Sequence, residues 1–140
     1  MTPKKISYVV IFAMLVFSVH LLSADDSAKG PKIEFEESSF DWGTVQQGSQ
    51  VKHIFKFKNV GSDTLKIDRV KTSCGCTAAE SSKVIAPNEF GQIDVTFNTG
   101  TRKGKASKTV YVYSNDVEAS RRSVVIHGMI EADPSSEAKE

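Results

Sequence analysis

Apolar and polar residues alternate with a period of two along several stretches of this 140-residue chain. In one of them, the valine and phenylalanine side chains fall on one face together with His53, while lysines fall on the other. Successive side chains of a strand point to opposite faces, so this pattern predicts β-strands with one buried face. The stretches with the clearest alternation are residues 51–59, 92–98, 109–114 and 123–130.

Short segments rich in Gly, Asn, Asp and Pro separate these stretches, at residues 47–48, 59–63, 87–88, 98–100 and 114–116. Short strands with turns at this spacing predict an all-β fold, an immunoglobulin-like antiparallel β-sandwich of about seven strands. An antibody-type domain is not expected, because its two cysteines are widely spaced around a buried tryptophan. Here Cys74 and Cys76 are separated by one residue, and Trp42 precedes both.

The N-terminal segment has the order of features of a secretory signal peptide: two lysines, an apolar run from Ile6 to Leu22, and Ala24 before an acidic pair. Export to the periplasm or the cell exterior is therefore expected. An uncleaved membrane anchor is the alternative, since the apolar run approaches the length that spans a bilayer. The expected division is a signal peptide (1–24), a flexible lead-in (25–30), the sandwich (31–132) and a disordered tail (133–140).

Charge argues against nucleic-acid binding. The whole chain carries a formal net charge of +1, from 18 basic and 17 acidic residues. Cleavage after residue 24 removes Lys4 and Lys5 and leaves a charge of about −1. A nucleic-acid interface needs a strongly basic face. Membrane insertion is not expected once the signal peptide is cleaved.

The two cysteines, Cys74 and Cys76, flank Gly75. A structural disulfide is the usual role of two cysteines in an exported protein. In the chain-entropy model, however, a three-residue loop contributes only about 1.6 kcal/mol, and ring strain reduces that figure. A bridge is compatible with Gly75, which permits a sharp bend. Such a bridge stabilises the fold only weakly and is easily reduced.

Two other roles for the cysteine pair stay open. The pair can act as a thiol–disulfide exchange site, which needs a thiolate of lowered pKa beside a cation such as Lys71. Alternatively, two thiolates can capture Cu(I), which soft ligands select. His127 and Met129 share a strand face and can also bind copper, although an ordinary exposed face is the simpler interpretation. Apart from possible copper, no cofactor is expected.

Other chemistry has little support in the sequence. Zinc would want four ligands, and His53 and His127 are the two histidines after the signal segment. Alternation with Phe55 and Phe57 predicts a packing role for His53. Diagnostic Ser/His/Asp spacing, a phosphate-binding glycine loop and an acidic calcium loop are all missing from the sequence. The chain is therefore not expected to be an enzyme.

The order of motifs resembles an exported bacterial family classed as domain of unknown function 1573, which carries a Ser-Cys-Gly-Cys-Thr signature. The resemblance covers about residues 33–131. The matching positions are Phe40, Asp41, Trp42, Gly43, Phe55, Phe57, Asn59, Gly61, Ser73, Cys74, Gly75, Cys76, Thr77, Pro87, Gly91, Ser114, Asn115, Asp116 and Gly128. Trp42 stands where phenylalanine is commoner, and Asn88 where glycine usually follows the proline.

This resemblance implies an immunoglobulin-like sandwich related to ASPM–SPD-2–Hydin and major-sperm-protein domains, which bind other proteins. Together, these observations predict an exported, non-enzymatic binding module. Its partner would be an envelope or extracellular protein, contacted through a sheet edge or the loop that carries Cys74 and Cys76. A Cu(I)-binding periplasmic protein and a thiol–disulfide exchange protein are the alternatives.

Overall fold

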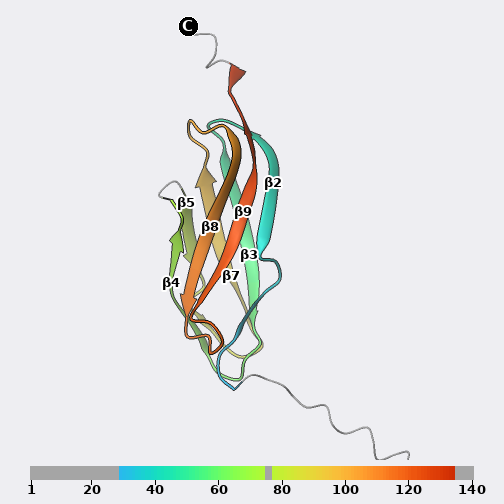
Figure 1. The fold of residues 1–140 in the computed structure, drawn as a ribbon. Coiled ribbons are helices and arrows are strands. Elements are labelled where there is room, and N and C mark those ends of the chain that lie inside the picture. The colour runs from blue at the N-terminus through green and yellow to red at the C-terminus, as the bar shows by residue number, and fades with distance from the viewer. Residues whose placement is uncertain (1–28, 75–76, 135–140) are drawn as a thin grey trace, which may run out of the picture.

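The computed structural model describes residues 29–74 and 77–134, which form two packed β-sheets (Figure 1). The predicted signal peptide, residues 25–28 and 135–140, and Gly75 and Cys76 lie outside the described residues. Within the described part of the chain, no helix is long and apolar enough to cross a membrane. The strands are β1 (Ile33–Phe35), β2 (Ser39–Gln46), β3 (Gln50–Asn59), β4 (Leu65–Thr72), β5 (Thr77–Ser81), β6 (Val84–Ile85), β7 (Phe90–Asn98), β8 (Gly104–Ser114) and β9 (Arg121–Glu131).

The two sheets have four and five strands. The first has the order β1-β3-β7-β5 and the second the order β2-β9-β8-β4-β6. This arrangement confirms the predicted immunoglobulin-like sandwich. The described residues contain nine strands rather than about seven, and two of the nine, β1 and β6, are only three and two residues long. Segments this short carry too few residues for alternation to reveal them.

One strand departs from the antiparallel arrangement that the sequence predicts. β2 pairs in parallel with β9, whereas the other strand pairs are antiparallel. β1 belongs to the first sheet and β2 to the second, so residues 36–38 carry the chain from one sheet to the other. The N-terminal part of the sandwich is therefore divided between the two sheets.

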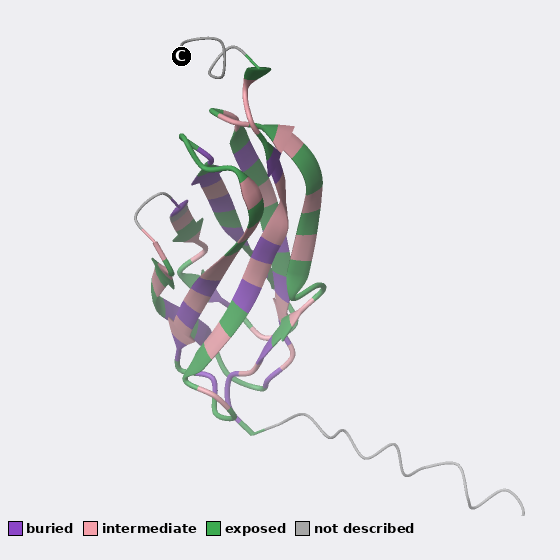
Figure 2. Cartoon of the chain, turned by 45° about the horizontal axis from the view of Figure 1, so that its top comes forward, coloured by how far each residue is buried: buried purple, intermediate pink, exposed green. Residues whose placement is uncertain are grey.

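The core lies between the sheets, and Figure 2 shows its buried positions alternating with exposed ones along the strands. The predicted alternation is confirmed in all four stretches, since their apolar faces are the buried ones. Burial of each large apolar side chain contributes about 1.5–3 kcal/mol. The buried apolar residues are Ile33, Val51, Phe55, Phe57, Leu65, Ile67, Ile85, Ile93, Val95, Phe97, Val110, Val112, Val124, Ile126 and Ile130.

A buried carboxylate ties β1 to the loop between β8 and β9. The side chain of Asp116 is fully buried. Its Oδ2 accepts hydrogen bonds from the backbone N–H of Ile33 (3.0 Å) and from Nε of Arg122 (2.9 Å). Its Oδ1 accepts from the backbone N–H groups of Glu118 (2.8 Å) and Ala119 (3.2 Å). One side chain thus joins segments more than 80 residues apart in the sequence.

These bonds keep Asp116 ionised. Burial by itself raises the pKa of the carboxyl group, because it penalises the charged form. The hydrogen bonds from Arg122 and from the three backbone N–H groups favour that form and outweigh burial, so the pKa of Asp116 lies below its ordinary value. The charge of Asp116 therefore stabilises the fold above the ordinary carboxyl pKa of about 3.9. That contribution is lost as the pH falls through the lowered pKa.

Asn59 has a similar role in the turn after β3. Its Oδ1 accepts from the backbone N–H of Gly61 (3.0 Å), and its Nδ2 donates to the carbonyl oxygens of Asp63 (2.8 Å) and Ile85 (3.0 Å). Any side chain at Gly61 would collide with the carbonyl oxygen of Gly30. Gly30 belongs to the predicted flexible lead-in, yet it is buried against this turn. The turn residues therefore fix where the N-terminal segment joins the sandwich.

We expect Asp116→Asn to lower the free energy of unfolding at pH 7 by about 3 kcal/mol, because it removes the buried charge that accepts hydrogen bonds from Arg122 and three backbone N–H groups. Since the native charge is lost in acid, the difference from the native chain should shrink as the pH falls from 7 toward 2. Urea unfolding across that range measures both effects. The control is Asp68→Asn, at an exposed position, which should change stability by less than about 0.5 kcal/mol. An equal loss at every pH would show that the charge of Asp116 does not matter.

Candidate functional site

One side of the sandwich has two strand edges that no described strand covers. β5 ends its sheet and pairs only with β7. β6 covers only the beginning of β4, at Leu65 and Lys66, which leaves the β4 edge from Asp68 to Thr72 without a partner strand in the described residues. β4 and β5 are in contact, and Figure 1 shows them together on the side opposite β2. Residues 73–76 connect these two edges.

The connection that carries Cys74 is anchored on both sides. The Thr72 hydroxyl lies 2.9 Å from the carbonyl oxygens of both Cys74 and Thr77, and the Thr77 N–H donates to the Cys74 carbonyl (3.3 Å). Ser73 and Thr109 of β8 exchange two hydrogen bonds, of 2.9 and 3.1 Å. The base of the loop is therefore rigidly placed at the end of both free edges.

Thr77 is buried, and its Oγ1 lies 3.7 Å from the Cys74 sulfur. The described residues contain no free cysteine. Gly75 and Cys76 lie outside the described residues, so copper binding or thiol–disulfide exchange by Cys74 and Cys76 stays a prediction from the sequence.

A groove with a volume of about 360 Å³ lies between the two edges. Val70 of β4 and Ala79 of β5 provide its apolar part, because both pack against the core. Arg69, Glu80 and Lys83 are exposed charged residues around it. The Arg69 guanidinium also stacks over the ring of Tyr113, 4.4 Å from the ring centre, which limits its movement. The groove thus has an apolar floor and a rim that carries both positive and negative side chains.

Ser81 gives the groove an unusual polar atom. Its Oγ is buried and has no hydrogen-bond partner among the described residues, and the residue lines the groove. A buried hydroxyl without a partner costs about 1–3 kcal/mol. Its neighbour Ser82 differs, since the Oγ of Ser82 accepts from the backbone N–H of Gln92 (3.1 Å). Ser81 was not predicted as a site residue, because a serine at a strand end carries no signal in the sequence that its hydroxyl will be buried.

The β5 edge is also the less protected of the two long outer edges. Proteins usually block edge pairing with lysine, proline or a bulge. β2 has such a bulge between Asp41 and Thr44, with Gly43 at a φ of 70°. β5 has the sequence Thr-Ala-Ala-Glu-Ser, which contains neither lysine nor proline, and it pairs with β7 in unbroken register. Its backbone is therefore open to an additional strand.

The structure separates the residues that the sequence combined as possible copper ligands. His127 and Met129 lie on β9, and β8 stands between β9 and β4, the strand that leads to Cys74. Two strand spacings amount to about 10 Å. His127 and Met129 therefore do not lie beside Cys74. Among residues 29–74 and 77–134, no three His, Cys, Asp or Glu side chains are grouped to hold a metal ion.

The aromatic residues of the resemblance pack inside the sandwich. Phe40 stacks on His53 with ring centres 3.7 Å apart, and His53 also bonds to Glu37 (2.7 Å), so this histidine has the expected packing role. Trp42 packs against Phe97 of the opposite sheet, at 5.4 Å between ring centres. Phe55 and Phe57 are fully buried.

The small and polar motif residues form turns and close contacts. Pro87 precedes Asn88, whose φ of 66° is the value that glycine adopts easily. Side chains at Gly91 and Gly128 would collide with Phe57 and Trp42 respectively. All three residues of the turn at 114–116 take part in hydrogen bonds. The Ser114 hydroxyl accepts a hydrogen bond from the Asp116 N–H, and Asp116 is the buried carboxylate described above. The Asn115 side chain bonds to the backbone of Thr64 and Lys66.

Comparison with known proteins gives a family and a fold. Residues 33–130 match the model of the family described as DUF1573, protein of unknown function. A search of curated proteins finds no match to the chain. A protein of unknown function from Porphyromonas gingivalis W83 is similar in structure, with a TM-score of 0.63 and 17% identity over 74% of this chain. This chain spans 48% of that protein's length.

Two further solved structures show the same fold. The ASH/PapD-like domain of human CEP192 has a TM-score of 0.57 and 11% identity, over 73% of this chain and 87% of that one. The secreted serine protease VesC from Vibrio cholerae has a TM-score of 0.57 and 15% identity, over 76% of this chain and 25% of the protease. At such identities the likeness concerns the fold alone.

The two neighbouring serines make a matched pair for a stability test. We expect Ser81→Ala to stabilise the isolated chain by up to about 1 kcal/mol, because it removes a buried hydroxyl that has no partner. Ser82→Ala should instead destabilise it by about 1 kcal/mol, because the Gln92 N–H loses its acceptor. Urea unfolding of both variants gives the two signs. Destabilisation by both would show that the Ser81 hydroxyl is satisfied in solution.

Proposed function

The chain belongs to the DUF1573 family, and on that premise we propose that it is an exported, non-enzymatic module that binds an extended segment of another protein along β5. The free edge of β5 supports this proposal, since it offers unpaired backbone groups to an added strand. The observation that carries most weight is the groove beside that edge, where the Ser81 hydroxyl is buried without a partner. If the Ser81 side chain turns toward the groove, a ligand can complete a hydrogen bond to its hydroxyl and so remove a cost that the free protein bears.

The groove defines the kind of segment that would fit. Side chains of an added strand alternate between the two faces of the extended sheet. Those that face the groove meet Val70 and Ala79, so small or β-branched apolar residues suit this face. A threonine, serine or asparagine next to Ser81 would also satisfy its hydroxyl. Backbone bonds supply affinity and these alternate positions supply selectivity.

The charges around the groove favour a segment with an acidic residue near its outer face. Arg69 and Lys83 lie on the rim, while Glu80 is the one acidic residue that lines the groove. Charge pairs at an exposed rim add little to affinity, but they speed association and select partners. The bound segment would therefore be apolar on the inner face and net acidic on the other.

The cysteine pair has a local role in this proposal. The lack of a free cysteine among the described residues supports a disulfide between Cys74 and Cys76, the two cysteines of the chain. A bridge this short stabilises the whole fold by only about 1.6 kcal/mol. It would instead stiffen the connection between β4 and β5 and hold the two edges at a fixed distance. Preorganisation of this kind improves affinity by reducing the ordering cost of binding.

Export follows from the sequence of residues 1–24, and the partner is accordingly an envelope or extracellular protein. A disulfide at Cys74 and Cys76 fits such a compartment, where oxidising conditions let disulfides persist. We assign no reaction to the groove, because a serine nucleophile needs a base hydrogen-bonded to it and the Ser81 hydroxyl has no such partner among the described residues.

Site-specific photo-cross-linking in living cells tests the proposal. We expect a photoreactive residue at Glu80, on the β5 edge, to capture a partner, and mass spectrometry should map the link to an extended, alternating segment. The same residue at Lys52, an exposed position on β3, which β7 separates from β5, is the control and should capture nothing comparable.

A second variant separates edge binding from chance proximity. Ala79→Glu places a charge at the groove floor and should reduce the Glu80 adduct at least about tenfold. Thermal unfolding must show that the variant stays folded. Equal capture from Lys52, or an adduct that Ala79→Glu leaves unchanged, would contradict binding along β5.

A further inference from the structure

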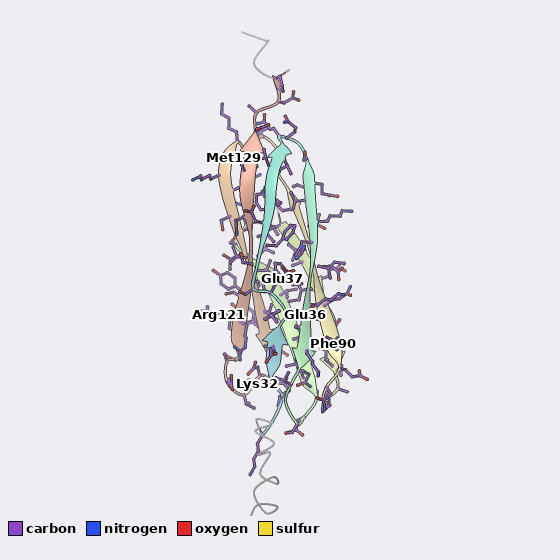
Figure 3. All side chains as sticks on the ribbon, turned by 90° about the vertical axis from the view of Figure 1, so that its right-hand side faces the viewer. Lys32, Glu36, Glu37, Phe90, Arg121 and Met129 are labelled. Atoms are coloured by element: carbon purple, nitrogen blue, oxygen red, sulfur yellow. The ribbon has the colours of Figure 1, made fainter. Side chains whose placement is uncertain are left out.

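A second group of functional side chains lies on the opposite side of the sandwich, where β2 runs beside β9. The parallel register places Asp41 directly opposite His127. Both residues line a surface hollow with a volume of about 710 Å³, together with Met129. Figure 3 shows Met129 toward one end of β9 and Arg121 toward the other. This hollow is separate from the groove at β5, and the binding proposed there does not use it.

His127 is held by one ring nitrogen and leaves the other available. Its Nε2 is hydrogen-bonded to the Ser39 hydroxyl at 3.0 Å. When Nε2 carries the proton and donates it to Ser39, the lone pair of Nδ1 lies on the side of Asp41. Metal-binding histidines are commonly oriented in this way, by a hydrogen bond from the nitrogen that does not bind the metal.

Asp41 is held in place as well. Its Oδ1 accepts a hydrogen bond of 2.8 Å from the Gly43 N–H, inside the bulge that Gly43 makes possible. The same oxygen lies 3.9 Å from Nδ1 of His127. This separation is too long for a hydrogen bond. A Ser–His–Asp catalytic relay needs that bond, so the geometry does not favour hydrolysis at Ser39.

The 3.9 Å separation suits a metal ion better. Transition metals bind imidazole nitrogen and carboxylate oxygen at about 2.0–2.2 Å, so one ion can reach both atoms. Met129 adds a third donor, because it shares the outer face of β9 with His127, two residues away. A thioether is a soft ligand that selects copper.

The scaffold behind these donors is rigid. Trp42 occupies the space on the inner face that a side chain at position 128 would otherwise fill. Its Nε1 donates to the Met129 carbonyl oxygen (3.3 Å). The segment from His127 to Met129 is thereby fixed from within, while its two donor side chains project outward. A built scaffold of this kind reduces the cost of assembling a site.

We infer that Asp41, His127 and Met129 form a surface site for one copper ion, with Ser39 as the residue that positions His127. The site includes neither cysteine, and β8 separates β9 from β4, the strand that leads to Cys74. Lys105 also lines the hollow, and its charge opposes a cation. This repulsion lowers the affinity for copper, so removing the charge of Lys105 should strengthen binding.

Copper titration tests this site in an untagged chain that carries the double substitution Cys74→Ser/Cys76→Ser. Native mass spectrometry and electron paramagnetic resonance follow the binding. We expect one Cu(II) per chain, with hyperfine coupling to one nitrogen. His127→Ala should abolish binding, and Asp41→Asn and Ser39→Ala should each weaken it by about tenfold or more. Ser107→Ala, which alters the same hollow without removing a donor, is the matched control and should leave binding unchanged.

Two further variants test the remaining parts of the inference. Met129→Leu should weaken Cu(I) binding at least about tenfold, because it removes the soft donor. Lys105→Ala should strengthen Cu(II) binding, since it removes a like charge. Three results would each overturn the site. They are copper binding that requires both cysteines, copper that stays bound in His127→Ala, and no binding at one equivalent of copper. Circular dichroism confirms that every variant is folded.

Discussion

The hydrogen bonds that Asp116 accepts hold the N-terminal part of this sandwich in place. Through Ile33 they fix β1 against β3, and through Arg122 they fix the start of β9. These bonds thereby place the short β1 strand and the start of β9 against the turn at 114–116. β2 then pairs in parallel with β9 along a ladder of its own, from Ser39 opposite Val125 to Gln46 opposite Glu131. Because breaking the charge pair of Asp116 and Arg122 is costly, this end of the fold tolerates little change.

The residues of the sequence resemblance are chiefly residues of architecture. Asn59, Gly61, Pro87 and Asp116 close turns or join strands, while Gly91 and Gly128 make room for Phe57 and Trp42. Asn59 and Asp116 are buried and the glycines have no side chain, so these residues offer little for a partner to contact. Binding is therefore better sought at polar atoms that are exposed or that lack a partner among the described residues. Asp41 is exposed, and the buried Ser81 hydroxyl lacks a partner.

The two candidate sites occupy opposite edges of the sandwich and differ in how the edge is built. At β5 the edge is regular, so its unpaired backbone can accept a strand. At β2 a bulge at Gly43 interrupts the edge, which disfavours strand addition, and the Gly43 N–H holds the carboxylate of Asp41, the residue opposite His127. The same fold can thus offer a protein-binding edge and an ion site that do not interfere with each other.

The sequence by itself determined four of the strands, the core residues that they carry and the main turns. Alternation identified the buried faces of β3, β7, β8 and β9, because a period of two is a local property of the chain. The short β1 and β6 were too brief to show it. Only the tertiary structure decided that β2 pairs in parallel with β9, that Asp41 lies opposite His127, and that the Ser81 hydroxyl is buried without a partner. These features join residues far apart in the chain, or depend on what packs around a side chain, so the pattern of neighbouring residues does not contain them.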